Sequence, residues 1–252
     1  MPIDYVRRLT SRERTVQSNR HLGFVLAFVA GATNAGAFLA VRQYTSHMTG
    51  IVSSMADNLA LGDLVPVLAG LGGLLSFLAG AATSAIMVNY SRRRQLHSEY
   101  ALPLLLEAAL LLCFGVLGSR LSTIEGLFIP VTVMLLCFMM GLQNAVISKL
   151  SNAEIRTTHV TGVVTDIGIE LGKLVYWNRS SPALQPEVRA NRARLRVLVT
   201  LVASFFAGGV LGALGFRSLG YSLTIPLALM LVMLAGVPAI DDFIRIARKS
   251  RS

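Results

Sequence analysis

The chain has 252 residues, of which 54% are hydrophobic and 14% are charged, and its mean hydropathy is +0.62. Soluble domains carry roughly a quarter charged residues, so this composition excludes an ordinary soluble surface. The net charge of +10 does not indicate nucleic-acid binding, because the Arg and Lys residues lie in short segments between long apolar runs. That distribution is typical of a protein that crosses a membrane several times.

The apolar runs follow one another in chain order, each near the ~20 residues that a helix needs to span a bilayer. They cover Leu22–Val41, Leu64–Val88, Ala101–Gly118, Gly126–Ile147, Val197–Phe216 and Tyr221–Ile240. The first run is too long for the apolar part of a cleavable signal, so we expect it to stay in the protein as a helix. The sequence therefore predicts an all-α polytopic membrane protein. The two cysteines, Cys113 and Cys137, lie inside these runs without metal-type spacing, which predicts free thiols.

Four motifs occur twice in the same order, which indicates an internal duplication. Gly31-x-x-Asn34-Ala35 returns as Gly141-x-x-Asn144-Ala145, and TSHMTG from Thr45 returns as TTHVTG from Thr157. SFLAG from Ser76 returns as SFFAG from Ser204, and the apolar run after Pro103 parallels the one after Pro226. The distance between the copies widens after the second motif, because the second copy carries the additional polar stretch Asn178–Arg196.

The duplication divides the chain into two membrane repeats, residues 21–119 and 120–240. A basic N-terminal segment (1–20) and a basic tail (241–252) flank them, and both are expected in the cytoplasm. The small-residue sets Ala79–Ala85 and Ala207–Ala213 are expected to let helices pack closely.

On the motifs SHMTG, GLQNA and TTHVTG, the chain resembles the YoaK-like bacterial membrane proteins, a family without an established function. The resemblance covers nearly the whole chain and implies an integral membrane protein. This sequence departs from the family at Asn34, where the family tends to carry Asp, and at Ile51, where the family tends to carry Asn.

The segments after each H-x-T-G motif, Ile51–Gly62 and Val163–Trp177, decide the topology. If both enter the membrane and return, the protein has six crossings, two re-entrant or broken helices and two inverted repeats. If both cross fully, it has eight crossings and parallel repeats. Six crossings place twenty Lys and Arg residues inside and three outside, whereas eight crossings place seven outside. The positive-inside rule favours six, with both termini in the cytoplasm of a bacterial inner membrane.

Each H-x-T-G segment carries a polar stripe on an otherwise apolar helix, at helical spacing. We predict a solute site near the membrane midplane formed by these stripes, where helix N-termini favour a polar or anionic solute. The candidate residues are His47, Thr49, Gly50, Ser54, Asn58, His159, Thr161, Gly162, Asp166 and Glu170. The alternative is that the segments only cap and pack two short helices, with Thr or Ser hydroxyls as N-caps.

Three further polar residues lie within apolar runs. Asn34 and Asn144 are candidates for the same solute site, although amides at such positions also join helices to one another. Glu107 is a candidate for proton coupling, because intramembrane carboxylates are commonly functional. A carboxyl with a structural partner, or one near the membrane surface, is the alternative.

These observations favour a transporter or channel for a small polar or anionic solute. A membrane scaffold or partner subunit is the alternative, and a metal-dependent intramembrane enzyme is less favoured, because no G-x-S-x-G, H-E-x-x-H or P-loop motif occurs. No cofactor or resident metal is expected. The expected partners are membrane lipid and a small molecule or ion, but not nucleic acid. The sequence is also compatible with a homo-oligomer.

Overall fold

The computed structural model describes residues 16–96, 98–121, 125–150, 160–176 and 188–249, and these residues form helices and turns without a strand. The long helices are α2 (Val16–Val41), α4 (Leu64–Arg93), α5 (Ala101–Leu121), α6 (Glu125–Leu150), α8 (Arg192–Leu219) and α9 (Thr224–Lys249). The short ones are α3 (Met48–Ala60), α7 (Val160–Val175) and the 3-10 turn η1 (Gly220–Leu223).

Five stretches are long and apolar enough to cross a membrane. They are Gln17–Val41, Leu64–Arg93, Ala101–Ser119, Pro130–Lys149 and Arg192–Gly236. The last is 45 residues long and contains both α8 and the first half of α9, on either side of η1. The prediction of an all-α fold is therefore confirmed for the described residues, and these include helices long and apolar enough to span a membrane.

The two segments that follow the H-x-T-G motifs are short helices. α3 has 13 residues and α7 has 16. At ~1.5 Å per residue these helices are about 20 and 24 Å long, less than the ~30 Å hydrocarbon core. Neither is among the stretches long enough to cross a membrane.

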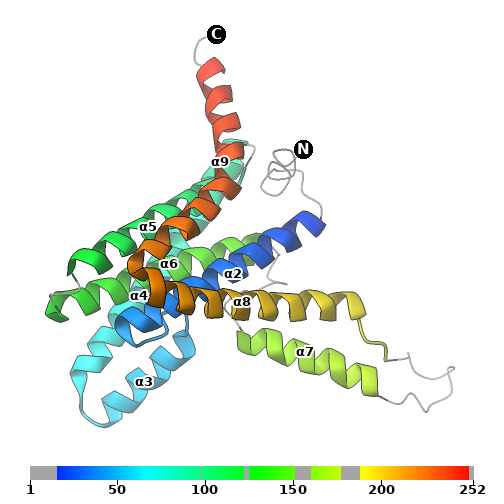
Figure 1. Cartoon of the computed structure of the whole chain (residues 1–252). Coiled ribbons are helices and arrows are strands. Elements are labelled where there is room, and N and C mark those ends of the chain that lie inside the picture. Colours follow the sequence, from blue (N-terminus) through cyan, green and yellow to red (C-terminus); the bar gives the residue numbers. More distant parts are fainter. Residues whose placement is uncertain (1–15, 97, 122–124, 151–159, 177–187, 250–252) are drawn as a thin grey trace.

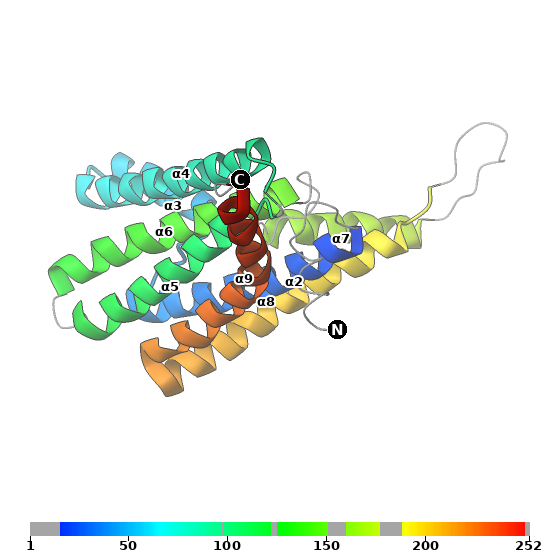
Figure 2. The ribbon, with the colours of Figure 1, turned by 90° about the horizontal axis from the view of Figure 1, so that it is seen from above.

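The helices pack mainly in three pairs: α2 with α8, α4 with α6, and α5 with α9. α3 packs on α4, and α7 packs on α8 (Figure 1). In both views α2, α5 and α8 run in one direction, and α4, α6 and α9 run in the opposite direction (Figure 2). The partners in the first two pairs are therefore parallel, and α5 and α9 are antiparallel.

Glycines bring the backbones of α2 and α8 into contact. A Cβ at Gly31 would collide with the carbonyl oxygen of Phe205, and a Cβ at Gly208 would collide with the carbonyl oxygen of Phe28. The contact is reciprocal, because each helix supplies a glycine to the other's backbone. Small residues at such crossings let membrane helices approach closely enough for extensive van der Waals contact.

The pair α4 and α6 meets in the same way. Gly141 faces the carbonyl oxygen of Phe77, and Gly80 faces the carbonyl oxygen of Phe138. Gly31 and Gly141 are the first residues of the two G-x-x-N-A motifs, and Gly80 and Gly208 are the last residues of SFLAG and SFFAG. The two crossings therefore use equivalent glycines of the two repeats. The expectation that the small-residue sets serve packing is confirmed for Gly80 and Gly208.

Matching residues also begin α4 and α8. The Asp63 carboxylate accepts a hydrogen bond from the Val65 amide (3.2 Å), and the Asn191 side-chain oxygen accepts one from the Arg194 amide (3.0 Å). Both are N-caps of the type that Asp and Asn favour. Counted back from SFLAG and SFFAG, Asp63 and Asn191 stand at equivalent positions of the two repeats.

Replacing Gly80 by Ala is expected to destabilise the protein. The added methyl would meet the backbone of α6, and the helix pair has to separate, at a cost of about 1–3 kcal/mol. Gly72→Ala on the same helix is the matched control, because its Cβ would meet nothing within 4 Å. That change is expected to be neutral or to stabilise by up to ~1 kcal/mol. Thermal unfolding in detergent measures both, and equal effects would contradict a role for Gly80 in the crossing.

Candidate functional site

A pocket of about 950 Å³ lies where α2 ends, bounded by α3, the start of α4 and the first half of α6. Its walls are largely apolar, from Phe38, Val41, Ile51, Pro66, Leu68, Ala69, Pro130, Val133 and Met134, with glycines at 50, 70 and 72. The polar side chains in its lining are Arg42, Gln43, Tyr44, His47 and Ser54, and none of the described residues that line it is acidic. We call it the α3 pocket.

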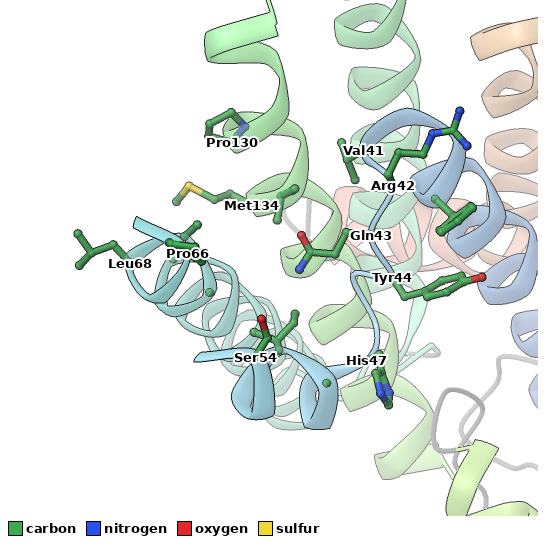
Figure 3. Close-up of a pocket in the computed structure, with 17 residues that line it drawn as sticks. Val41, Arg42, Gln43, Tyr44, His47, Ser54, Pro66, Leu68, Pro130 and Met134 are labelled. Carbon is green, nitrogen blue, oxygen red and sulfur yellow. The ribbon is translucent and has the colours of Figure 1, made fainter. Parts of the chain in front are cut away.

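Figure 3 shows how these side chains lie. The Gln43 amide and the Ser54 hydroxyl point into the space between α3 and α6, whereas the Arg42 guanidinium points away from it. The Arg42 amide donates the last helical hydrogen bond of α2, to the Phe38 carbonyl (2.9 Å), and the positive φ of Arg42 (56°) turns the chain out of the helix. The Tyr44 ring stacks on Phe38 at 4.8 Å between centroids. In this turn Gln43 is directed into the pocket, while Tyr44 packs against α2.

The motif Thr45–Gly50 connects this turn to α3. Thr45 is fully buried, and the Ser46 hydroxyl donates to the Asn34 side-chain oxygen (3.0 Å). His47 is the N-cap residue of α3, without a side-chain capping bond, and its imidazole lies against Gly50. The expected Thr or Ser N-cap is therefore absent at α3, because the Ser46 hydroxyl is used to tie the motif to α2.

The predicted stripe on α3 is only partly directed at the pocket. His47, Gly50 and Ser54 line it, while Thr49 is exposed and does not. The Asn58 amide is used within the helix, donating to the Ser54 carbonyl (2.7 Å) and hydroxyl (3.2 Å). Only residues in the first half of the stripe therefore line the pocket.

The second motif leads to a different arrangement. Thr157, Thr158 and His159 lie outside the described residues. On α7, Thr161 and Gly162 are exposed, and the Thr165 hydroxyl donates to the Thr161 carbonyl (2.9 Å). Neither Thr161 nor Gly162 lines a described pocket.

The acidic residues of α7 bind the start of α8. Asp166 forms an ion pair with Arg194 (2.9 Å). The Glu170 carboxylate is only 2% exposed and accepts hydrogen bonds from the Lys173 ammonium (2.9 Å) and the Asn191 backbone amide (2.7 Å). Both carboxylates thus have partners within the protein. Neither lines the α3 pocket with His47 and Ser54.

The ion pair occupies positions that line the pocket in the first repeat. Counted from the H-x-T-G motifs, Asp166 is equivalent to Ser54, and counted from SFLAG and SFFAG, Arg194 is equivalent to Pro66. In the first repeat those two positions are uncharged and line the α3 pocket. In the second they are joined across α7 and α8. Equivalent positions thus line an open pocket in the first repeat, whereas in the second repeat they are joined by an ion pair.

A smaller pocket of about 270 Å³ lies where α2 and α8 begin, and we call it the α2–α8 pocket. The residues that line it are Gln17, Arg20, His21, Phe24, Arg196, Val197 and Thr200.

The two pockets share repeat positions. Counted from the G-x-x-N-A motifs, Arg20 and Phe24 are equivalent to Pro130 and Met134 of the α3 pocket. The same holds on α8, counted from SFFAG and SFLAG: Arg196, Val197 and Thr200 are equivalent to Leu68, Ala69 and Gly72. Each pocket therefore combines residues of both halves of the chain, and the two pockets use corresponding positions of the repeats.

The amides within the bundle make interhelical or local contacts. Gln143 on α6 is fully buried and donates to the Leu26 carbonyl on α2 (3.2 Å). Asn34 accepts from Ser46, and Asn144 is half-buried. Neither asparagine lines a described pocket, and the contact of Asn34 ties the motif after α2 back to that helix.

Glu107 lies in the core of α5 with no exposed surface, and neither carboxyl oxygen has a hydrogen-bond partner among the described residues. Buried polar groups are nearly always paired, and each exception calls for a physical reason. The equivalent position in the second repeat is Met230 on α9, the helix that packs against α5.

Sequence reasoning missed most of the α3 pocket, which comes from the end of α2, residues 42–44, the start of α4 and the first half of α6. Gln43 and Tyr44 directly precede the repeated motif, but nothing in their pattern indicates that the turn folds back over α3. Among the α6 residues that line the pocket, Pro130 is the one that the sequence marks, since proline frees a backbone carbonyl within a membrane helix.

The bundle of long apolar helices around glycine crossings is typical of polytopic membrane proteins. Over residues 22–237 the chain matches the family described as "Protein of unknown function (DUF1275)", and it belongs to that family. The resemblance to YoaK-like proteins is consistent with this assignment. No curated protein and no solved structure matches the chain.

Replacing Glu107 by Met, the residue at the equivalent position of the second repeat, is expected to stabilise the protein. The change removes a buried carboxyl that lacks a partner, a group that costs on the order of 1–3 kcal/mol. Leu104→Met, a fully buried neighbour on α5, is the control for placing Met in this core. Thermal unfolding in detergent compares them. A larger loss of stability in Glu107→Met than in Leu104→Met would mean that the carboxyl has a partner.

Proposed function

We propose that the protein is a multi-pass transporter or channel of the bacterial cytoplasmic membrane for a small polar or anionic solute. The observation that carries the proposal is the α3 pocket. Ligand sites are commonly concave and largely apolar, with a few polar groups that fix orientation. Here those groups are Gln43, His47 and Ser54. The lack of an acidic side chain in the lining favours a neutral or negatively charged solute over a cation.

The proposed topology has six crossings and two inverted repeats, with both termini in the cytoplasm. The antiparallel pair α5 and α9 supports it. Gly115 lies against Thr224 and Gly118 against Tyr221, so the end of α5 meets the start of α9. A twofold axis that exchanges two antiparallel helices is perpendicular to them and therefore lies in the membrane plane. Parallel repeats would require α5 and α9 to run in the same direction.

The two pockets supply the proposed solute path. The α3 pocket lies at the end of α2 and the α2–α8 pocket at its beginning, so they open at opposite ends of the bundle. Inverted repeats commonly use such a pair to expose one site alternately to each side. The larger outer pocket and the Asp166–Arg194 bridge near the smaller one fit a state open to the outside.

Glu107 is the proposed proton-binding residue. It lies between the two repeats on α5, and an ionised carboxylate without a partner is very costly to bury in an apolar interior. Binding or loss of a proton there would change the energy of the α5–α9 contact. Glu107→Met is therefore expected to remove any acceleration of flux by a pH gradient, and unchanged acceleration would exclude the role.

Cysteine labelling distinguishes the two topologies. In a background without Cys113 and Cys137, single cysteines at Gln43 and Ser119 are expected to react with a membrane-impermeant thiol reagent on intact cells. A cysteine at Gln95 is expected to react only after permeabilisation. All three positions are exposed. Eight crossings would reverse the results at Ser119 and Gln95, while Gln43 reports the outside in either case.

Filling the α3 pocket is expected to block flux. Ser54→Trp places a large ring in the space that the Ser54 hydroxyl faces. In proteoliposomes, light scattering measures the entry of chloride, formate, phosphate and glycerol. At least one of these probes is expected to enter faster than in protein-free liposomes, and Ser54→Trp is expected to slow it about tenfold or more.

Ser53→Trp is the matched control, because Ser53 is exposed and does not line the pocket. Its flux should equal that of the unmodified protein. Equal flux in Ser54→Trp would exclude this pocket as the path. If no probe enters above the protein-free rate, the scaffold alternative is favoured.

A further inference from the structure

The α2–α8 pocket differs chemically from the α3 pocket at the positions that they share. Where the α3 pocket has Pro130 and Leu68, the α2–α8 pocket has Arg20 and Arg196. Two arginines from two different helices thus line a space of about 270 Å³. None of the described residues in its lining is acidic.

The two arginines keep hydrogen-bonding capacity for a ligand. Neither forms an ion pair among the described residues. Arg196 uses its Nε in a long hydrogen bond to the Arg192 carbonyl (3.4 Å), which leaves its terminal nitrogens. By contrast, Arg194, two residues earlier, is bound by Asp166. The guanidinium fork matches the oxygens of a phosphate group, and its charge is not lost at any physiological pH.

The rest of the lining fits a site at the edge of the hydrocarbon region. Phe24 and Val197 supply an apolar wall, and the candidate membrane spans begin at Gln17 and Arg192. The Thr200 hydroxyl already donates to the Arg196 carbonyl (2.8 Å), so it is available to a ligand only as an acceptor. The guanidinium groups therefore dominate recognition at this site, and a neutral solute gains little from them.

We propose that Arg20 and Arg196 bind a phosphate group in the α2–α8 pocket, either that of an anionic phospholipid headgroup or free phosphate. Basic pockets between membrane helices on the cytoplasmic side are a recurrent headgroup site. The placement on that side rests on the proposed topology. The binding itself does not, so the site can be tested whether or not the protein conducts solutes.

The test measures thermal stabilisation of the purified full chain in a neutral detergent. One arm adds phosphatidylglycerol against equal phosphatidylcholine, and the other adds inorganic phosphate against chloride at equal ionic strength. Stabilisation by phosphatidylglycerol alone identifies the headgroup, and stabilisation by phosphate as well identifies a site for the free anion. In either case Arg20→Gln with Arg196→Gln is expected to weaken the apparent affinity about tenfold or more, since two charge-assisted contacts are lost.

Arg192→Gln is the matched control. It lies one turn before Arg196 on α8, removes the same charge and does not line the pocket. Its affinity should stay within about twofold of the unmodified protein. An equal loss in Arg192→Gln and Arg196→Gln would overturn the proposal, because general charge would then explain the binding. No stabilisation in either arm would also overturn it. A protein that fails in the flux assay but retains this binding would leave the phosphate site standing.

Discussion

The close contact of helix backbones at glycines is the constraint on which the rest of this structure depends. Lipid tails are as apolar as leucine, so helices in a membrane gain little from hiding apolar side chains from lipid. Helix association therefore depends on close van der Waals packing. The glycines at 31, 208, 80 and 141 make it possible, because each leaves room for a backbone carbonyl of the partner helix. With α2 fixed on α8 and α4 fixed on α6, the short helices α3 and α7 are held at the sides of the two pairs, which places the pockets.

Much of this framework could be predicted from sequence, because it follows from properties of single segments. Helix length follows from the extent of an apolar run, as at α4, and helix crossings follow from small-residue sets such as Ala207–Ala213. The short length of α3 follows from the few residues available before Gly62, which has a positive φ of 79°. The duplication is visible because its motifs keep their order.

The candidate site was less predictable, since it depends on contacts between distant residues. Nothing local indicates that Ser46 will bind Asn34 rather than cap α3, because the hydroxyl suits both uses. The polar stripe on α7 predicts solute ligands, whereas Asp166 pairs with Arg194 of α8 and Glu170 accepts from the Asn191 amide just before α8. Both partners lie beyond a long polar segment, so local sequence does not indicate them. Sequence shows that a stripe is polar, but the facing helix determines whether it meets solute or protein.

The antiparallel pair α5 and α9 has a consequence for the history of the chain. Under the proposed topology, cutting the protein between the repeats would leave two halves that associate as an antiparallel pair, each completing the other's glycine crossings. A single ancestral half would then have inserted in both orientations and formed this assembly with its own copy. Fusion of two such genes frees each half to acquire its own charge bias and its own residues. The first half has Glu107 where the second has Met230, and Arg20 where the second has Pro130. An assembly of two identical halves does not permit such differences.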